Sequence, residues 1–110
     1  MNNLDLYQDE ARSMAIYPNL GDNIYYPTLG LAGEAGEVCE KVKKVMRDSD
    51  GEISQKVKDA LLLEMGDVLW YLANIASELE VDLSEVAHRN LEKLYSRKTR
   101  GVLGGSGDNR

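Results

Sequence analysis

The stretch "LLLEMGDVLWYLANIA", Leu61 to Ala76, decides the fold because it is apolar on almost every side of a helix. Ten of its sixteen residues are Leu, Met, Val, Trp, Tyr or Ile, and two more are Ala. A helix of this kind is buried on several sides. Two acids, Glu64 and Asp67, nevertheless lie within it, three residues apart. An unpaired carboxylate there is costly, so these acids need a proton, a partner or a metal ion.

Periodic apolar residues predict four helices in all. The first is expected over residues 4–17, where Pro18 ends it, and the third over residues 53–78. The second runs from the region of Pro27 to Arg47, with either Thr28 as its cap or Pro27 in its first turn. The fourth follows Asp82 or Ser84, either of which can cap it, and ends near Thr99.

No strand pattern interrupts these helices, so the fold class is all-α and resembles a four-helix bundle. One domain is expected over residues 1–99, followed by a flexible, glycine-rich tail over residues 100–110. Three neighbouring helices in a chain of 110 residues are too few to cover the third helix. We therefore expect the protein to oligomerise through its apolar helices.

Composition excludes several classes of protein. The net charge of −6 and the pI of about 4.7 disfavour a nucleic-acid binder, and the basic cluster over residues 41–47 is too short to reverse this. Cys39 and His88 are the only residues of their types, so neither a disulfide nor a Cys- or His-rich metal site is expected. No secretory or membrane-spanning segment is apparent, which makes the cytoplasm the default location.

The two acids of the third helix have counterparts on the second. Glu34 and Glu37 in "GLAGEAGEVCEK" are also three residues apart and share one face of their helix. If the two helices pack antiparallel, both acid pairs face one cavity. On the third helix Tyr71 and Asn74 lie on the face of the acids. Trp70 points away from that face, towards the core or a dimer interface.

Four carboxylates together require a cation, and oxygen ligands favour Mg²⁺, with Mn²⁺ possible. A metal ion would also let an acidic protein bind a polyphosphate. Two alternatives remain open from the residues alone. Glu34 and Glu37 could form a solvated face paired with Lys41 and Lys44, and an Arg from another helix could pair with the acids of the third helix.

The two acid-bearing segments, "GEAGEVCEKVKK" from Gly33 and "EMGDVLWYL" from Glu64, resemble the MazG-like members of the all-α NTP pyrophosphohydrolase superfamily. That family carries Glu-x-x-Glu on one helix and Glu-x-x-Asp on the next. Its pattern often begins with two adjacent acids, and Gly33 stands here in place of the first. The resemblance extends from about Tyr7 to Arg97 and is closest to the short, single-domain members.

The resemblance implies a Mg²⁺-dependent enzyme that hydrolyses (d)NTP between the α- and β-phosphates to (d)NMP and pyrophosphate. It also implies dimers or dimers of dimers, with the base bound near the first helix and the loop before the second. Glu34, Glu37, Glu64 and Asp67 would be the metal ligands, and one glutamate of this set would orient or deprotonate the attacking water. The expected substrate contacts are Tyr71, Asn74, Lys93, Arg97, Lys41 and Tyr26.

Several of these positions have a simpler structural interpretation. Lys93 and Arg97 could be an ordinary solvated surface, and Tyr17, Tyr25 and Tyr26 could pack the N-terminal loop rather than stack on a base. His88 is expected on a helix surface, and Cys39 in the core or at an interface.

Two other functions are compatible with the residues. The first is a non-enzymatic helical interaction module whose acids pair with a partner's basic residues. The second is a Mg²⁺-dependent hydrolase of another phosphorylated nucleotide, such as an alarmone. The four acids alone do not separate this second function from NTP hydrolysis.

Overall fold

The computed structural model describes residues 3–107, and this part of the chain is helical without strands. The prediction of an all-α fold with four helices is therefore confirmed. The helices are α1 (Asn3–Ser13), α2 (Tyr25–Asp48), α3 (Gln55–Glu78) and α4 (Leu83–Thr99). None of them is both long and apolar enough to cross a membrane. The ends of the predicted domain and tail, residues 1–2 and 108–110, lie outside the described residues.

Helix boundaries differ from the predictions at the end of α1 and at the starts of α2 and α3. α1 ends at Ser13, four residues before the predicted end at Tyr17. α2 starts at Tyr25, so Pro27 lies in its first turn and Thr28 is not its cap. α3 starts two residues later than expected, because Ser54 is the N-cap and its hydroxyl accepts a hydrogen bond from the amide of Val57 at 3.2 Å. Between them, Asp50 and Gly51 adopt positive φ angles of 51° and 81°, which reverse the chain.

α4 is capped by α1 rather than by its own first residues. Asp82 is at the N-cap position, but its side chain makes no capping hydrogen bond. Instead Gln8 accepts from the amide of Leu83 at 2.7 Å, and Asp5 accepts from the amide of Ser84 at 3.0 Å. These bonds satisfy amides that would otherwise lack partners at the start of a helix, and they join α1 to the start of α4.

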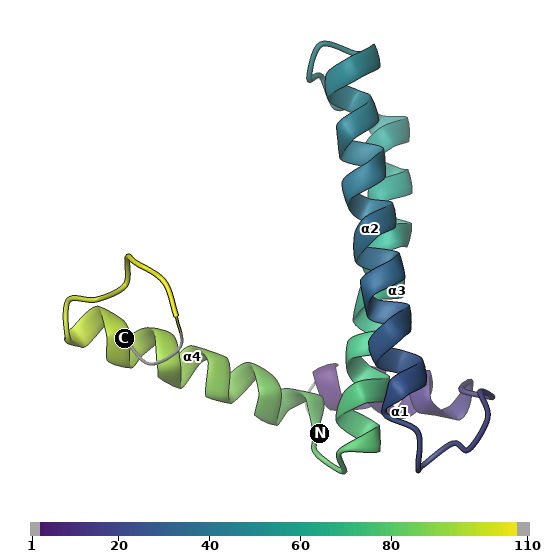
Figure 1. The fold of residues 1–110 in the computed structure, drawn as a ribbon, viewed down its shortest axis with the longest axis vertical. Helices are drawn as coiled ribbons and strands as arrows, with labels where there is room; N and C mark the ends of the chain where they lie inside the picture. The colour runs from purple at the N-terminus through teal and green to yellow at the C-terminus, as the bar shows by residue number, and fades with distance from the viewer. Residues whose placement is uncertain (1–2, 108–110) are drawn as a thin grey trace.

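The helices form an open arrangement (Figure 1). α2 and α3 run side by side as a long antiparallel hairpin, α1 crosses the base of this hairpin, and α4 extends away from it. Among the described residues α4 contacts α1 and α3 but not α2. The buried core is small and lies where α1, α3 and α4 meet; it consists of Ala11, Ala73, Ala76 and Leu83, with Tyr7 and Trp70 packed against it.

This arrangement is less compact than that of a typical small domain. The radius of gyration is 16.8 Å, whereas a compact chain of this length has a value of about 13 Å. The accessible surface is 8035 Å² for a mass of 12.3 kDa, whereas a folded monomer of that mass exposes about 6,100 Å². The four helices thus do not close into a bundle within one chain, because α4 covers no part of α2.

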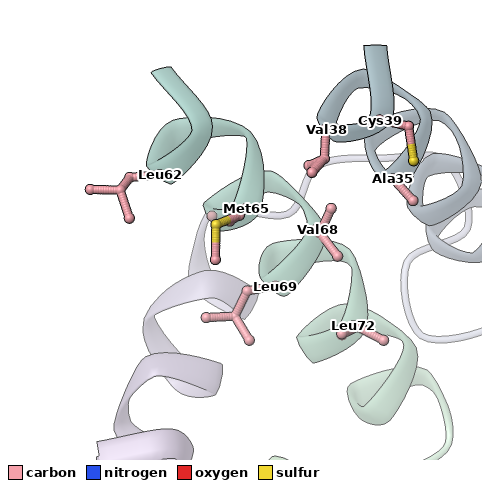
Figure 2. Close-up of a pocket in the computed structure, with 9 residues that line it drawn as sticks. Ala35, Val38, Cys39, Leu62, Met65, Val68, Leu69 and Leu72 are labelled. Carbon is pink, nitrogen blue, oxygen red and sulfur yellow. The ribbon is translucent and has the colours of Figure 1, made fainter. Parts of the chain in front are cut away.

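Much of the extra surface is apolar and lies along one side of the hairpin. Ala35, Val38 and Cys39 of α2 and five apolar side chains of α3 line a groove of about 720 Å³ (Figure 2). The α3 residues are Leu62, Met65, Val68, Leu69 and Leu72. Cys39, expected in the core or at an interface, is exposed in the single chain and lines this groove.

Candidate metal centre

Three of the four predicted acids meet across the hairpin. Glu34 of α2 and Glu64 and Asp67 of α3 each contribute a carboxylate oxygen, and these three oxygens lie within 4.8 Å of one another. We call these residues the acid trio. Glu34 and Glu64 are half-buried and Asp67 is exposed. The trio forms because the short turn over residues 49–54 folds α3 back along α2.

The trio carries more negative charge than its neighbours neutralise. Within residues 3–107, the one basic side chain at ion-pair distance is Lys41, whose Nζ lies 3.8 Å from Oε1 of Glu64. The pKa of the Glu34 carboxyl is raised by partial burial, by the charges of Asp67 and Glu64, by hydrogen bonding to Glu64 and by the charge of Glu37. Both observations describe carboxylates that would be stabilised by a cation.

A small, hard divalent cation fits this donor set. Mg²⁺ takes oxygen ligands at about 2.0–2.1 Å in octahedral geometry, so two of its ligands lie about 3–4 Å apart. Three carboxylate oxygens already within 4.8 Å of one another need only small side-chain movements to reach that spacing. No histidine or cysteine contributes to the trio, which is consistent with a preference for Mg²⁺ or Mn²⁺.

Glu37, the fourth predicted ligand, is not brought into the trio. Its side chain is exposed one turn further along α2, close enough for its charge to raise the pKa of Glu34. A role for Glu37 as a metal ligand stays a prediction. The alternative in which Glu34 and Glu37 pair with Lys41 is not found, because Lys41 lies beside Glu64 of α3.

Tyrosines border the trio at the start of α2. The ring of Tyr71 packs so closely on Gly30 that a Cβ at that glycine would overlap it. The pKa of Tyr71 is raised by burial, by Tyr26, and by the charges of Glu34 and Asp67. Tyr26 lies next to Tyr71, with ring centroids 6.5 Å apart, and stacks on Tyr17 at 4.7 Å. An aromatic surface therefore adjoins the acids, and Tyr26 is 45% exposed.

Asn74 lies deeper than its neighbours on α3. It is almost fully buried, and its oxygen accepts a hydrogen bond from Nη1 of Arg12 at 3.0 Å. Its amide nitrogen donates to the carbonyl of Trp70 at 3.1 Å. Contact between Asn74 and a substrate stays a prediction, and in this structure the residue joins α3 to α1. Trp70 was expected in the core or at a dimer interface, and it packs against the core.

The predicted basic pair is not near the acids in the single chain. Lys93 and Arg97 are on α4, which extends away from the hairpin (Figure 1). Arg97 is buried at the end of α4, where its Nη2 donates to the carbonyl of Gly107 at 3.3 Å. His88 is exposed on the same helix, as expected for a helix-surface residue, and its Nε2 lies 2.8 Å from Oε1 of Glu92.

Sequence reasoning missed a second acidic position, Glu78 at the end of α3. Its carboxylate pairs with Arg12 at 2.5 Å, and its side chain is 1% exposed. An Arg from another helix was one predicted partner for Glu64 and Asp67, but in the structure Arg12 pairs with Glu78 instead. The only signal was an acid at the end of an apolar helix, which is common on surfaces and did not single Glu78 out.

Comparison with known proteins agrees with this geometry. Residues 27–102 match the family described as "MazG nucleotide pyrophosphohydrolase domain". The chain is also 54% identical over 112 residues to "Gene 37 protein" of Mycobacterium phage L5, and the alignment covers 97% of this chain and 98% of that protein. No solved structure matches the chain significantly. The matched family region contains α3, α4 and all of the acid trio.

Proposed function

Because the chain belongs to the MazG nucleotide pyrophosphohydrolase family, we propose that it hydrolyses (d)NTP between the α- and β-phosphates with Mg²⁺, or with Mn²⁺ in its place. The products are (d)NMP and pyrophosphate. The observation that carries this proposal is the acid trio, which lies across the hairpin with one lysine beside it. An acidic protein that binds a triphosphate needs a metal ion between the two negative charges.

In this proposal the trio binds the metal through Glu34, Glu64 and Asp67. The bound ion would polarise the phosphate oxygens and lower the pKa of water. Hydrolysis forms one P–O bond to the oxygen of water and breaks the anhydride bond between the α- and β-phosphates. Glu37 remains outside the trio, so its carboxylate is available to orient the water and to take its proton. Lys41, which lies beside Glu64, would contact the phosphates.

The aromatic surface at the start of α2 would bind the base. Tyr26 presents an exposed ring face, and Tyr17 supports the other side of the ring. Tyr71 connects this surface to the acids. A nucleotide with its base on Tyr26 would extend along the α2–α3 hairpin, so that its phosphates reach the trio and Lys41. Stacking of this kind tolerates different bases.

We also propose that two copies associate through the groove of the hairpin. The chain exposes 8035 Å², which is about 1,900 Å² more than a compact monomer of its mass. Obligate homodimers bury about 1,000 Å² or more from each subunit, so the excess is sufficient for a stable pair. On α3 the groove residues Leu62, Met65 and Leu69 face away from the acids, so a pair that buries them would leave the trio accessible. Lys93 and Arg97 would then have to reach the phosphates from the second copy.

The association is tested by the mass in solution. Sedimentation equilibrium should give a multiple of 12.3 kDa, twice this value for a dimer. Leu69→Glu places a charge in the groove and should shift the mass towards one chain, whereas Leu103→Glu in the exposed tail segment should not. A wild-type protein of monomer mass at micromolar concentration would contradict this part of the proposal.

The reaction is tested by pyrophosphate release from a panel of NTPs and dNTPs, with Mg²⁺ and with EDTA. Release of pyrophosphate and monophosphate in equal amounts is expected only with the metal, and Glu64→Gln should abolish it. Glu52→Gln removes one exposed negative charge in the hairpin turn and serves as the control. A folded, metal-supplied protein that turns over no NTP would contradict the proposal and favour the interaction module. Turnover of an alarmone alone would favour the other hydrolase.

A further inference from the structure

We propose that Glu78, together with Arg12, is a positioning residue for the nucleotide substrate. It holds the segment over residues 17–23 so that the exposed ring face of Tyr26 stays beside the acid trio. The inference rests on the proposed function, since it concerns how tightly that site binds a nucleotide. Glu78 acts through this segment and need not touch metal or substrate.

The Glu78 carboxylate is surrounded by hydrogen-bond donors. Its Oε2 accepts from Nη2 of Arg12 at 2.5 Å, from the hydroxyl of Tyr17 at 2.7 Å and from the amide of Gly21 at 2.9 Å. Its Oε1 accepts from the amide of Asn23 at 2.6 Å. Burial alone raises the pKa of Glu78, but the hydrogen bonds from these four groups outweigh it and lower the pKa to about 2. The group is therefore ionised whenever the protein is folded near neutral pH.

The segment that Glu78 binds has few other means of support. Residues 18–22 are all exposed, and Leu20 within them is 46% exposed. Asn19 and Gly21 have positive φ angles of 56° and 93°, so the segment is a sharp turn rather than part of a helix. Because apolar packing is slight here, the bonds to one buried carboxylate determine where the segment lies.

The position of this segment determines the position of Tyr26 in two ways. The Asn23 side chain accepts a hydrogen bond at 3.1 Å from the amide of Tyr26, which lies in the first turn of α2. The ring of Tyr17, whose hydroxyl is bound by Glu78, stacks on the ring of Tyr26. Asn23 and Tyr17, the two residues that contact Tyr26 here, each donate a hydrogen bond to Glu78. Loss of that carboxylate should therefore loosen Tyr26 without moving the acids.

The distance to the trio predicts which kinetic constant will change. Glu78 and Asp67 are eleven residues apart on α3, which is about 16 Å along the helix axis. A base stacked on Tyr26 makes the same contact before and during the reaction, so weakening it changes ground-state and transition-state binding equally. We expect KM to rise while kcat stays nearly constant.

The first experiment measures kcat and KM of wild type and Glu78→Gln, with saturating Mg²⁺ and the best substrate found in the panel. KM should rise roughly tenfold, kcat should stay within about twofold, and Mn²⁺ affinity should not change. Glu80→Gln is the matched control, because it removes an exposed carboxylate two residues away. An unchanged KM in folded Glu78→Gln, or a fall in kcat at constant KM, would overturn the inference.

A double-mutant cycle with Tyr26→Ala tests whether Glu78 acts through this ring. If it does, Glu78→Gln should raise the KM of the Tyr26→Ala enzyme by no more than about twofold, whereas independent effects would multiply. Multiplied effects would overturn the inference.

Tyr17→Phe replaces Glu78→Gln if the latter does not fold, because it removes one hydroxyl from the Glu78 set and keeps the stacked ring. A smaller rise in KM at constant kcat is then expected, and none would count against the inference. A wild type without turnover would refute the proposed function as well, whereas an active wild type with unresponsive variants would refute the inference alone.

Discussion

α3 carries two kinds of carboxylate, and their surroundings are opposite. Glu78 at its end is buried and accepts four hydrogen bonds, which lower its pKa to about 2. Glu64 and Asp67 near its middle meet Glu34 of α2. Among the described residues, the one basic group at ion-pair distance from them is Lys41, whose Nζ lies 3.8 Å from Oε1 of Glu64. The pKa of Glu34 is raised, partly by its acidic neighbours. The same chemical group thus has four hydrogen-bond donors from the protein at one position and a single nearby lysine at the other.

From this difference we expect Glu78 to stabilise the fold and the acid trio to serve the proposed reaction. A carboxylate whose donors all come from the protein contributes to stability, and removing it should unfold or loosen the chain. A cluster of carboxylates without enough donors costs stability in the absence of metal, and removing one member should affect activity rather than folding. Three changes test this distinction and a fourth tests the packing beside the trio; they are described from the largest expected effect to the smallest.

Glu64→Gln should reduce turnover by about a hundredfold or more, because it removes a ligand atom from the trio. Its thermal unfolding without metal should occur at the wild-type temperature or above, since one repelling charge is gone. Steady-state pyrophosphate release and circular dichroism check the two halves. A variant that loses activity only because it unfolds would remove the distinction between Glu64 and Glu78.

Glu78→Gln should lower the free energy of unfolding by about 3 kcal/mol at neutral pH, the equivalent of the shift from its ordinary pKa to about 2. The folded pKa is depressed, so this contribution is complete above about pH 4.5 and disappears as the pH falls towards 2. Urea unfolding at pH 7 and at steps below pH 4.5 measures the difference, which should shrink with acid. An equal deficit at every pH would show that the charge of Glu78 is not what stabilises the fold.

Mg²⁺ should stabilise the wild-type protein, because it binds the folded trio and not the unfolded chain. The expected gain is about 2.7 kcal/mol when free Mg²⁺ is a hundred times the dissociation constant. Thermal unfolding over a Mg²⁺ titration measures it, with matched NaCl as the ionic-strength control. Glu64→Gln should lose the gain and Glu78→Gln should keep it. The reverse result would exchange the roles of the two carboxylate groups.

Gly30→Ala should have the smallest effect. The added Cβ would overlap the ring of Tyr71, and such overpacking costs about 1–3 kcal/mol, which the better helix propensity of Ala offsets by about 1 kcal/mol. Gly33→Ala, on the same helix, meets no atom within 4 Å and should be neutral or stabilising. Urea unfolding of both variants measures the contrast. Equal stability of the two would mean that Tyr71 does not need Gly30 for its place beside the trio.

The residues that meet near the middle of the hairpin were predictable from the sequence. The three-residue spacing of each acid pair sets which residues share a helix face, and the turn over residues 49–54 makes the two helices antiparallel. Glu37 shows the limit of this reasoning. It shares a face with Glu34 but lies outside the trio, because the crossing of two real helices brings only part of each face together.

The sequence by itself determined the four helices, the acid-bearing faces of α2 and α3, and the excess of apolar surface, since these depend on periodicity and composition over a few turns. Only the tertiary structure decided that Glu78 pairs with Arg12, that Gln8 and Asp5 cap α4, and that α4 turns away from α2. The bonds from Glu78, Gln8 and Asp5 join residues that are separated by 55 to 79 positions in the chain. No local pattern encodes such pairs, because which donor meets which acceptor depends on how the helices pack.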